Sequence, residues 1–165
     1  MKKYLHFALF AILAAIPFTF ISCGDDEDDD DVSGGSIVGT WKSDLIQDMG
    51  ELWEDSFETF MAYYQFNNDG TYTYVDVTVY KDDWLEVFGG PKEEIIVEKG
   101  KWYTKGDKIY VTSTESTDPE DTIGETLTYE YQVNGNKLIL TWTRGIIFST
   151  TFTRIPDKTI EKYLK

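Results

Sequence analysis

The chain has 165 residues with 30 acids against 15 bases, so its formal net charge at neutral pH is −15. This charge disfavours binding to nucleic acid, whose phosphate backbone is also negative. A single cysteine and a single histidine exclude an intramolecular disulfide and leave too few ligands for the usual zinc sites.

The first segment has the order of a lipoprotein export signal. Two lysines precede an apolar stretch, Phe7–Ile21, and Cys23 follows it directly after Ser22. This order predicts a signal peptide over 1–22 that is cleaved before Cys23, whose thiol then carries palmitate. A transmembrane interpretation of the same apolar segment is the alternative. Because His6 lies in this segment, the cleaved chain has no histidine and no free thiol, and we expect no catalytic residues, metal site or cofactor.

Acidic residues fill the stretch after Cys23. Seven consecutive acids, Asp25–Asp31, are followed by Val-Ser-Gly-Gly-Ser. Since like charges repel and glycine is flexible, we expect a disordered tether over 23–36 that holds the domain off the membrane. Calcium binding by this run is an alternative, although the run lacks the glycine and the spacing of a calcium loop.

Strand patterns recur from residue 37 to residue 155. β-branched and aromatic residues dominate eight stretches, as is typical of strands. The predicted strands are 37–42, 60–67, 71–80, 94–103, 108–113, 127–133, 137–143 and 146–154. The turns 67–70 and 134–136 contain the asparagine and glycine residues that β-hairpins need. Eight strands joined mostly by short turns predict an all-β fold, an antiparallel up-and-down eight-stranded β-barrel over 37–155.

Two connections and the tail are less regular. Residues 44–59 place apolar side chains at helical intervals, which predicts a short helix or lid across one end of the barrel. Residues 80–92 are expected to form a long loop whose apolar side chains pack nearby. The tail, 156–165, begins with proline and predicts a short helix that docks Ile160 and Leu164 on the barrel.

Period-two alternation assigns the two faces of the strands. The predicted inward residues are Phe66, Tyr72, Tyr74, Gly100, Trp102, Ile109, Val111, Leu127, Tyr129, Tyr131, Val133, Leu138, Leu140 and Trp142. Strand carboxylates such as Glu94 and Glu98 are expected on the solvated face. Asp76 is the exception, because it has the same parity as Tyr74, which favours an inward position. The alternative is that Asp76 lies near the mouth of the barrel and stays hydrated.

The motif Gly39-Thr40-Trp41 resembles the G-x-W signature of the lipocalin-like domains of bacterial lipoproteins, and the hairpin 66–72 is similar to one that they carry. The resemblance implies a barrel-closing pair in which Arg154 lies over the ring of Trp41. Residues 20–23 resemble a lipobox, with Phe20 where the family prefers leucine. The acids after Cys23 look like the export signal of Bacteroidota-type surface lipoproteins. They imply a lipid anchor in the outer membrane with the domain at the cell surface, and a periplasmic-facing anchor is the alternative.

Two functions remain open at the level of the sequence. An eight-stranded barrel either holds one small ligand or is filled by its own side chains. In the first case a small apolar ligand would contact Tyr72, Tyr74, Trp102, Tyr129 and Tyr131, with Trp53, Trp84 and Phe88 lining the mouth. In the second case the chain is a structural or interaction module, and exposed aromatic residues meet an envelope protein partner.

Overall fold

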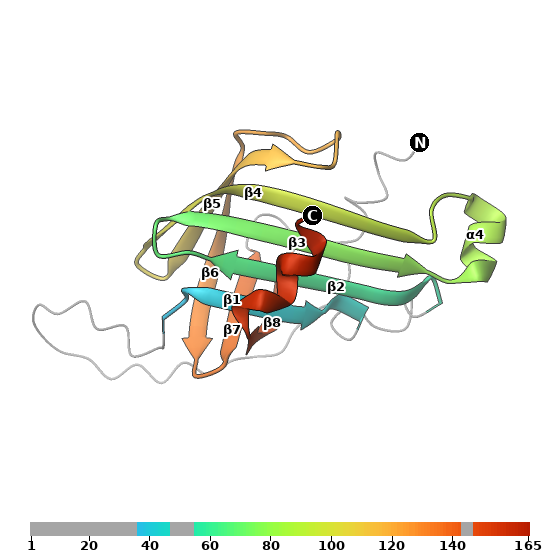
Figure 1. The fold of residues 1–165 in the computed structure, drawn as a ribbon. Coiled ribbons are helices and arrows are strands. Elements are labelled where there is room, and N and C mark those ends of the chain that lie inside the picture. The colour runs from blue at the N-terminus through green and yellow to red at the C-terminus, as the bar shows by residue number, and fades with distance from the viewer. Residues whose placement is uncertain (1–35, 47–54, 143–146) are drawn as a thin grey trace, which may run out of the picture.

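The computed structural model describes residues 36–46, 55–142 and 147–165. They form a closed barrel in which each strand pairs antiparallel with its sequence neighbours, and β1 pairs with β8 (Figure 1). The predicted all-β, up-and-down eight-stranded barrel is therefore confirmed. The predicted signal peptide and Cys23, with the tether as far as residue 35, lie outside the described residues. No helix in the described part of the chain is both long and apolar enough to cross a bilayer.

The elements follow the predicted order. They are β1 (Gly39–Asp44), β2 (Phe57–Phe66), β3 (Thr71–Tyr80), α4 (Asp82–Phe88), β4 (Glu93–Lys105), β5 (Lys108–Ser116), β6 (Thr126–Asn134), β7 (Lys137–Trp142), β8 (Phe148–Ile155) and η2 (Asp157–Tyr163). The turns β2–β3, β4–β5 and β6–β7 are tight, and in an up-and-down barrel they lie at the same end. We call this end the floor and the opposite end the mouth.

The irregular segments differ from the sequence-based expectations. The predicted helix over 44–59 is wrong at its C-terminal end, because β2 already begins at Phe57 and this side chain is buried. Residues 47–54, including Trp53, lie outside the described residues. The predicted loop over 80–92 is also wrong, since it contains the helix α4. This helix caps the long β3–β4 hairpin, far from the floor turns (Figure 1).

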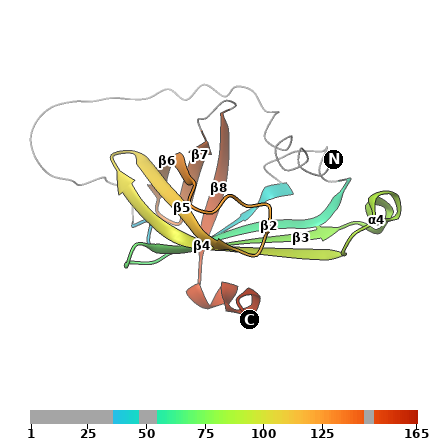
Figure 2. The ribbon, with the colours of Figure 1, turned by 90° about the horizontal axis from the view of Figure 1, so that it is seen from above.

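The C-terminal tail packs on the outside of the barrel. Figure 2 shows η2 on the opposite side of the β2–β4 sheet from β6, β7 and β8. Its Ile160 is 0% exposed and packs with Val75 and Val77, which point outward from β3. The predicted docking of Leu164 is wrong, because this side chain is 40% exposed. The tail therefore gives the outer face of β3 an apolar core of its own.

Candidate functional site

The floor of the barrel is closed by Trp41 and Arg154. The Trp41 side chain is 0% exposed, and its indole Nε1 donates a hydrogen bond to the Ile37 carbonyl, 2.7 Å away. The Arg154 guanidinium lies 4.0 Å from the centroid of the Trp41 ring and donates to the Val38 carbonyl. A guanidinium over an indole gains cation–π energy. The same guanidinium also ties down the backbone just before β1 through its hydrogen bond to Val38.

A glycine makes room for this arginine. Gly39 has a φ of 130°, a backbone conformation that residues other than glycine rarely adopt. A Cβ at this position would also lie 2.3 Å from a guanidinium nitrogen of Arg154. The Gly-x-Trp spacing therefore has a steric cause. Glycine admits the arginine, and two residues later the chain presents the tryptophan beneath it.

Above the floor, four tyrosines from three strands gather inside the barrel. We call Tyr64, Tyr72, Tyr74 and Tyr129 the tyrosine cluster. The ring centroid of Tyr64 lies 4.7 Å from that of Tyr74 and 6.3 Å from that of Tyr72. Tyr64 also stacks on Phe66 at 5.1 Å, which joins the cluster to the floor. The hydroxyl of Tyr129 lies beside that of Tyr64, so four phenol hydroxyls gather in one part of the interior.

The electrostatics of the cluster keep its hydroxyls neutral. Burial is the main cause that raises the pKa of Tyr64, Tyr72 and Tyr74 far above the usual tyrosine value. Burial likewise raises the pKa of Tyr129 to about 12, although the neighbouring hydroxyl of Tyr64 partly offsets the effect. A neutral phenol is both a donor and an acceptor of hydrogen bonds. The cluster can therefore offer either role to a molecule that reaches it.

Glu98 on β4 lies beside the cluster. Its carboxylate accepts a hydrogen bond from the Tyr72 hydroxyl, and its side chain is half-buried. Burial raises the pKa of Glu98 and the charge of Asp121 adds to the shift, while the bond from Tyr72 acts against it. The expectation that Glu98 lies on the solvated face is wrong. It shares parity with Gly100 and Trp102, so strand alternation turns it inward.

Further carboxylates continue from the cluster along β3 and β4. Asp76 accepts hydrogen bonds from the Thr78 hydroxyl at 2.9 Å and from the Tyr74 hydroxyl at 3.3 Å. Glu94 accepts one from the Tyr80 hydroxyl at 3.0 Å and is half-buried, so the expectation of full solvation is wrong for it too. By register, Asp76 and Glu94 lie on the mouth side of Glu98. The inner face of these two strands is therefore acidic and aromatic.

Ser113 adds a polar group without a partner. This side chain on β5 is 7% exposed, and its Oγ makes no hydrogen bond to any described residue. It lies close enough to the Tyr72 hydroxyl to act on it as a weak donor, which partly offsets the raised pKa of Tyr72, but the two groups do not form a hydrogen bond of regular geometry. A buried hydroxyl that makes no hydrogen bond destabilises the fold. The interior therefore contains a polar atom that a bound molecule could satisfy.

Gly100 shapes the wall between these groups. A Cβ on Gly100 would lie 2.0 Å from the Thr112 carbonyl oxygen and 2.6 Å from Cε1 of Tyr72. The β4–β5 register also shifts between Lys99 and Gly100. The glycine thus lets the Tyr72 ring approach β4 closely, where its hydroxyl reaches Glu98.

The structure gathers three of the five predicted ligand-contacting residues. Tyr72, Tyr74 and Tyr129 belong to the cluster. Trp102 lies lower, where its ring packs edge-on against Phe66 at 5.3 Å and its Nε1 donates to the Asn67 carbonyl. Tyr131 is two residues nearer the β6–β7 turn than Tyr129, and it packs against the hydrophobic core. Trp102 and Tyr131 therefore belong to the floor.

Sequence reasoning missed Tyr64, Glu98 and Ser113. Alternation contained the signal, since each stands two residues from a position already assigned to the interior: Phe66, Gly100 and Val111. Glu98 was expected on the solvated face because the carboxylates of strands are usually exposed to solvent. The unmet hydrogen bond of Ser113 depends on atomic geometry, and no pattern in the sequence encodes it.

The predicted mouth residues on α4 lie away from the cluster. Rings form a ladder from β2 to α4: Phe57 contacts Tyr80 at 5.3 Å, Tyr80 stacks on Trp84 at 4.5 Å, and Trp84 contacts Phe88 at 4.9 Å. We call these four residues the aromatic ladder. Phe88 at its end is 67% exposed.

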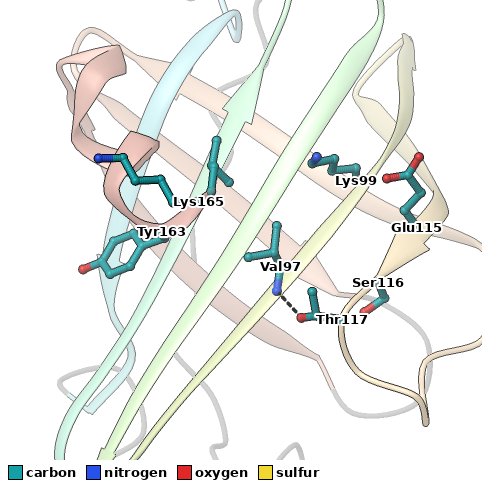
Figure 3. A pocket seen from close by; sticks show the side chains of 8 residues that line it. Val97, Lys99, Glu115, Ser116, Thr117, Tyr163 and Lys165 are labelled. Atoms are coloured by element: carbon teal, nitrogen blue, oxygen red, sulfur yellow. Dashed lines mark hydrogen bonds between the residues drawn. The ribbon is translucent and has the colours of Figure 1, made fainter.

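A depression on the outside of the barrel is a weaker candidate site. It has a volume of about 220 Å³ and lies between β4, β5 and the C-terminal residues, as Figure 3 shows. Its lining residues are Val97, Lys99, Glu115, Ser116, Thr117, Tyr163, Leu164 and Lys165. Val97 N donates to Thr117 Oγ1 at 2.9 Å, and Thr117 N donates to the Val97 carbonyl at 3.0 Å. Val97 and Thr117 therefore use these polar groups to bond to each other, which makes the depression a weaker candidate for binding a ligand.

No cluster of three or more acidic, histidine or cysteine side chains among the described residues could hold a metal ion. Comparison with known proteins identifies no relative: no family model matches the chain, and no curated protein matches its sequence. The candidate site therefore has to be judged from its own chemistry.

Proposed function

We propose that the chain is a lipid-anchored protein of the cell envelope whose barrel binds one small ligand at the tyrosine cluster, without catalysing a reaction. The observation that carries the proposal is Ser113, whose buried hydroxyl makes no hydrogen bond to a described residue and lies beside a tyrosine–carboxylate network. A barrel filled only by its own side chains would favour an apolar residue there. The half-buried rings of Tyr64, Tyr74 and Tyr129 provide apolar contact area for the ligand body.

The anchoring part of the proposal rests on the sequence around Cys23. The lysines, the apolar stretch and the cysteine have the order of a lipoprotein signal, and the acidic run resembles a surface-export signal. Labelling with a palmitate analogue should mark the wild type but not Cys23→Ala. Protease treatment of intact cells should remove the domain, and full protection would contradict surface display.

Native mass spectrometry tests the binding part. The full chain, purified from its own cells in mild detergent, should retain one small molecule in a one-to-one ratio. Tyr129→Ala should lose that molecule, while Tyr103→Ala, which removes an exposed ring on the outer face, should keep it. A wild-type protein without any retained molecule, combined with no response to added ligands, would contradict binding.

The aromatic ladder favours a second candidate, a module that binds an envelope protein. Phe88 and Val87 are the most exposed apolar side chains of α4, and exposed apolar groups of this kind mark interaction sites. A photo-crosslinking residue at Phe88 in intact cells should then trap one defined protein, whereas the same residue at Tyr103 should not. Equal labelling at both positions would contradict this candidate.

A further inference from the structure

The carboxylates of the candidate site act as hydrogen-bond acceptors for the tyrosines around them. The hydroxyl protons of Tyr72 and Tyr74 are already donated to Glu98 and Asp76. Nearer the mouth, Tyr80 donates to Glu94. Glu98 keeps lone pairs that can only accept, whereas the hydroxyls of Tyr129 and Ser113 can still donate or accept. A ligand group that lies beside Glu98 therefore has to donate a hydrogen bond.

The charge at the site has the same implication. Within the described chain, Glu98 has one hydrogen bond, from Tyr72, and no lysine or arginine forms an ion pair with it. The described ion pairs join Lys92 to Glu58 and to Asp82 on the outside. Arg154 is the described cation on the inner face, and it lies over Trp41 at the floor. A partly buried carboxylate without a countercharge attracts a cation.

The rings around Glu98 suit an organic cation better than a bare metal ion. A metal ion needs several oxygen ligands at once, and no group of three or more acidic, histidine or cysteine side chains in the described part of the chain could hold one. The rings of Tyr64 and Tyr74 lie 4.7 Å apart and provide aromatic surface near Glu98. Aromatic rings attract ammonium groups through their negative faces and bury the attached carbon chain. The hydroxyl of Ser113 supplies one more acceptor beside Tyr72, and it makes no hydrogen bond to a described residue.

We infer that the ligand of this barrel is an organic amine in its charged form, with an aromatic or apolar body that packs against the tyrosine cluster and an ammonium group that donates to Glu98 and Ser113. This inference rests on the proposed ligand-binding function and adds the chemical class of the ligand. It also predicts the orientation, with the charge toward β4 and β5.

Three probes of similar size distinguish two questions: whether the barrel binds a small ligand, and whether that ligand is a cation. The full chain in lipid nanodiscs is titrated by calorimetry with 2-phenylethylamine, 2-phenylethanol and phenylacetate, and empty nanodiscs are the reference. The amine should bind at least tenfold more tightly than the alcohol, and phenylacetate should bind most weakly. If the alcohol binds as well as the amine, the ligand-binding function stands and the cation is wrong. If none of the three binds, the ligand-binding function is contradicted as well.

A matched pair of variants tests the role of the carboxylate. Glu98→Gln keeps the shape of the side chain and removes its charge, so the amine should lose at least tenfold in affinity while the alcohol keeps its own. Glu130→Gln makes the same change in net charge on the exposed outer face of β6 and should leave both affinities unchanged. Equal losses in both variants would overturn the assignment, because they would reflect the overall charge.

A titration of the wild type needs no variant. Amine affinity should fall as the pH decreases through the raised pKa of Glu98, whereas alcohol affinity should stay constant. The ionisable groups that face Glu98 are Tyr72 and Tyr74 from β3, Tyr64 from β2, Tyr129 from β6 and Asp121 from the β5–β6 connection. The tyrosines stay protonated over this range, and Asp121 is exposed. An amine affinity that does not change with acidification would contradict the role of Glu98.

Discussion

The two ends of the barrel interior are built from similar aromatic residues but differ in how their polar groups are paired. At the floor, the indole nitrogens of Trp41 and Trp102 and the guanidinium of Arg154 all donate to backbone carbonyls. In the tyrosine cluster, polar side chains bond mainly to one another, and Ser113 has no hydrogen-bond partner among the described residues. The polar side chains of the floor are thus paired with backbone carbonyls, whereas the interior beside the cluster keeps a buried hydroxyl, that of Ser113, without a hydrogen bond to a described residue. This difference is the reason why we propose a structural role for the floor and a binding role for the cluster.

The largest effect should come from the floor. Trp41→Ala should lower the free energy of unfolding by about 3–5 kcal/mol, because a large ring is removed from a closed core and leaves a cavity. Phe88→Ala removes a ring that is mostly exposed on α4 and should cost less than about 0.5 kcal/mol. Urea denaturation of both variants is the measurement. Similar costs for both would contradict the assignment of the floor as the structural end.

A smaller but still clear loss is expected at Gly39. Gly39→Ala should destabilise by about 1–3 kcal/mol, because the added Cβ meets the guanidinium of Arg154 and the backbone has a φ of 130°. In an Arg154→Ala background the clash disappears and the backbone strain remains. The same substitution should then cost about 1 kcal/mol less. An identical cost in both backgrounds would show that the arginine does not occupy this space.

Two buried serines allow a direct comparison between a hydroxyl with a hydrogen bond and a hydroxyl without one. The Oγ of Ser43 donates to the Thr151 carbonyl at 2.8 Å, and Ser43→Ala should cost about 1 kcal/mol. Ser113→Ala removes a hydroxyl that no described residue satisfies, so the variant should be as stable as the wild type or up to about 1 kcal/mol more stable. Thermal unfolding of both variants distinguishes them. A clear loss of stability in Ser113→Ala would mean that its hydroxyl is paired in the folded chain.

The smallest effect should come from Glu98, and its sign depends on pH. Burial raises the pKa of Glu98 in the folded chain, so folding favours the protonated form. The stabilising contribution of that form is present below the unfolded pKa and is lost as the pH rises through the folded pKa. Since glutamine cannot ionise, Glu98→Gln should unfold at an equal or higher urea concentration than wild type at neutral pH. The difference should disappear below about pH 4, near the ordinary glutamate pKa. A variant that is less stable at neutral pH would contradict this account.

The fold could be predicted from the sequence because its signals are local. Alternating apolar residues and the turns 67–70 and 134–136 predict the strands and their order, and the Gly-x-Trp motif marks β1. The segments around α4 could not be placed, since their apolar residues pack on one another along the aromatic ladder rather than on the barrel. The inward tyrosines follow from alternation, and so does the inward Glu98, but its charge argued for the solvated face. Its position is made tolerable by the hydroxyl of Tyr72, which comes from a different strand.

The contrast between the two ends of the interior can be observed in one NMR titration of the full chain with 2-phenylethylamine, recorded on ring signals. The account predicts that the signals of Tyr64, Tyr72, Tyr74 and Tyr129 shift together with one saturation curve. The indole N–H signals of Trp41 and Trp102 should stay in place, because both protons are bonded to floor carbonyls. Shifts at the indoles, or shifts confined to Trp84 and Phe88 on α4 with the tyrosines unchanged, would contradict a binding site in the tyrosine cluster.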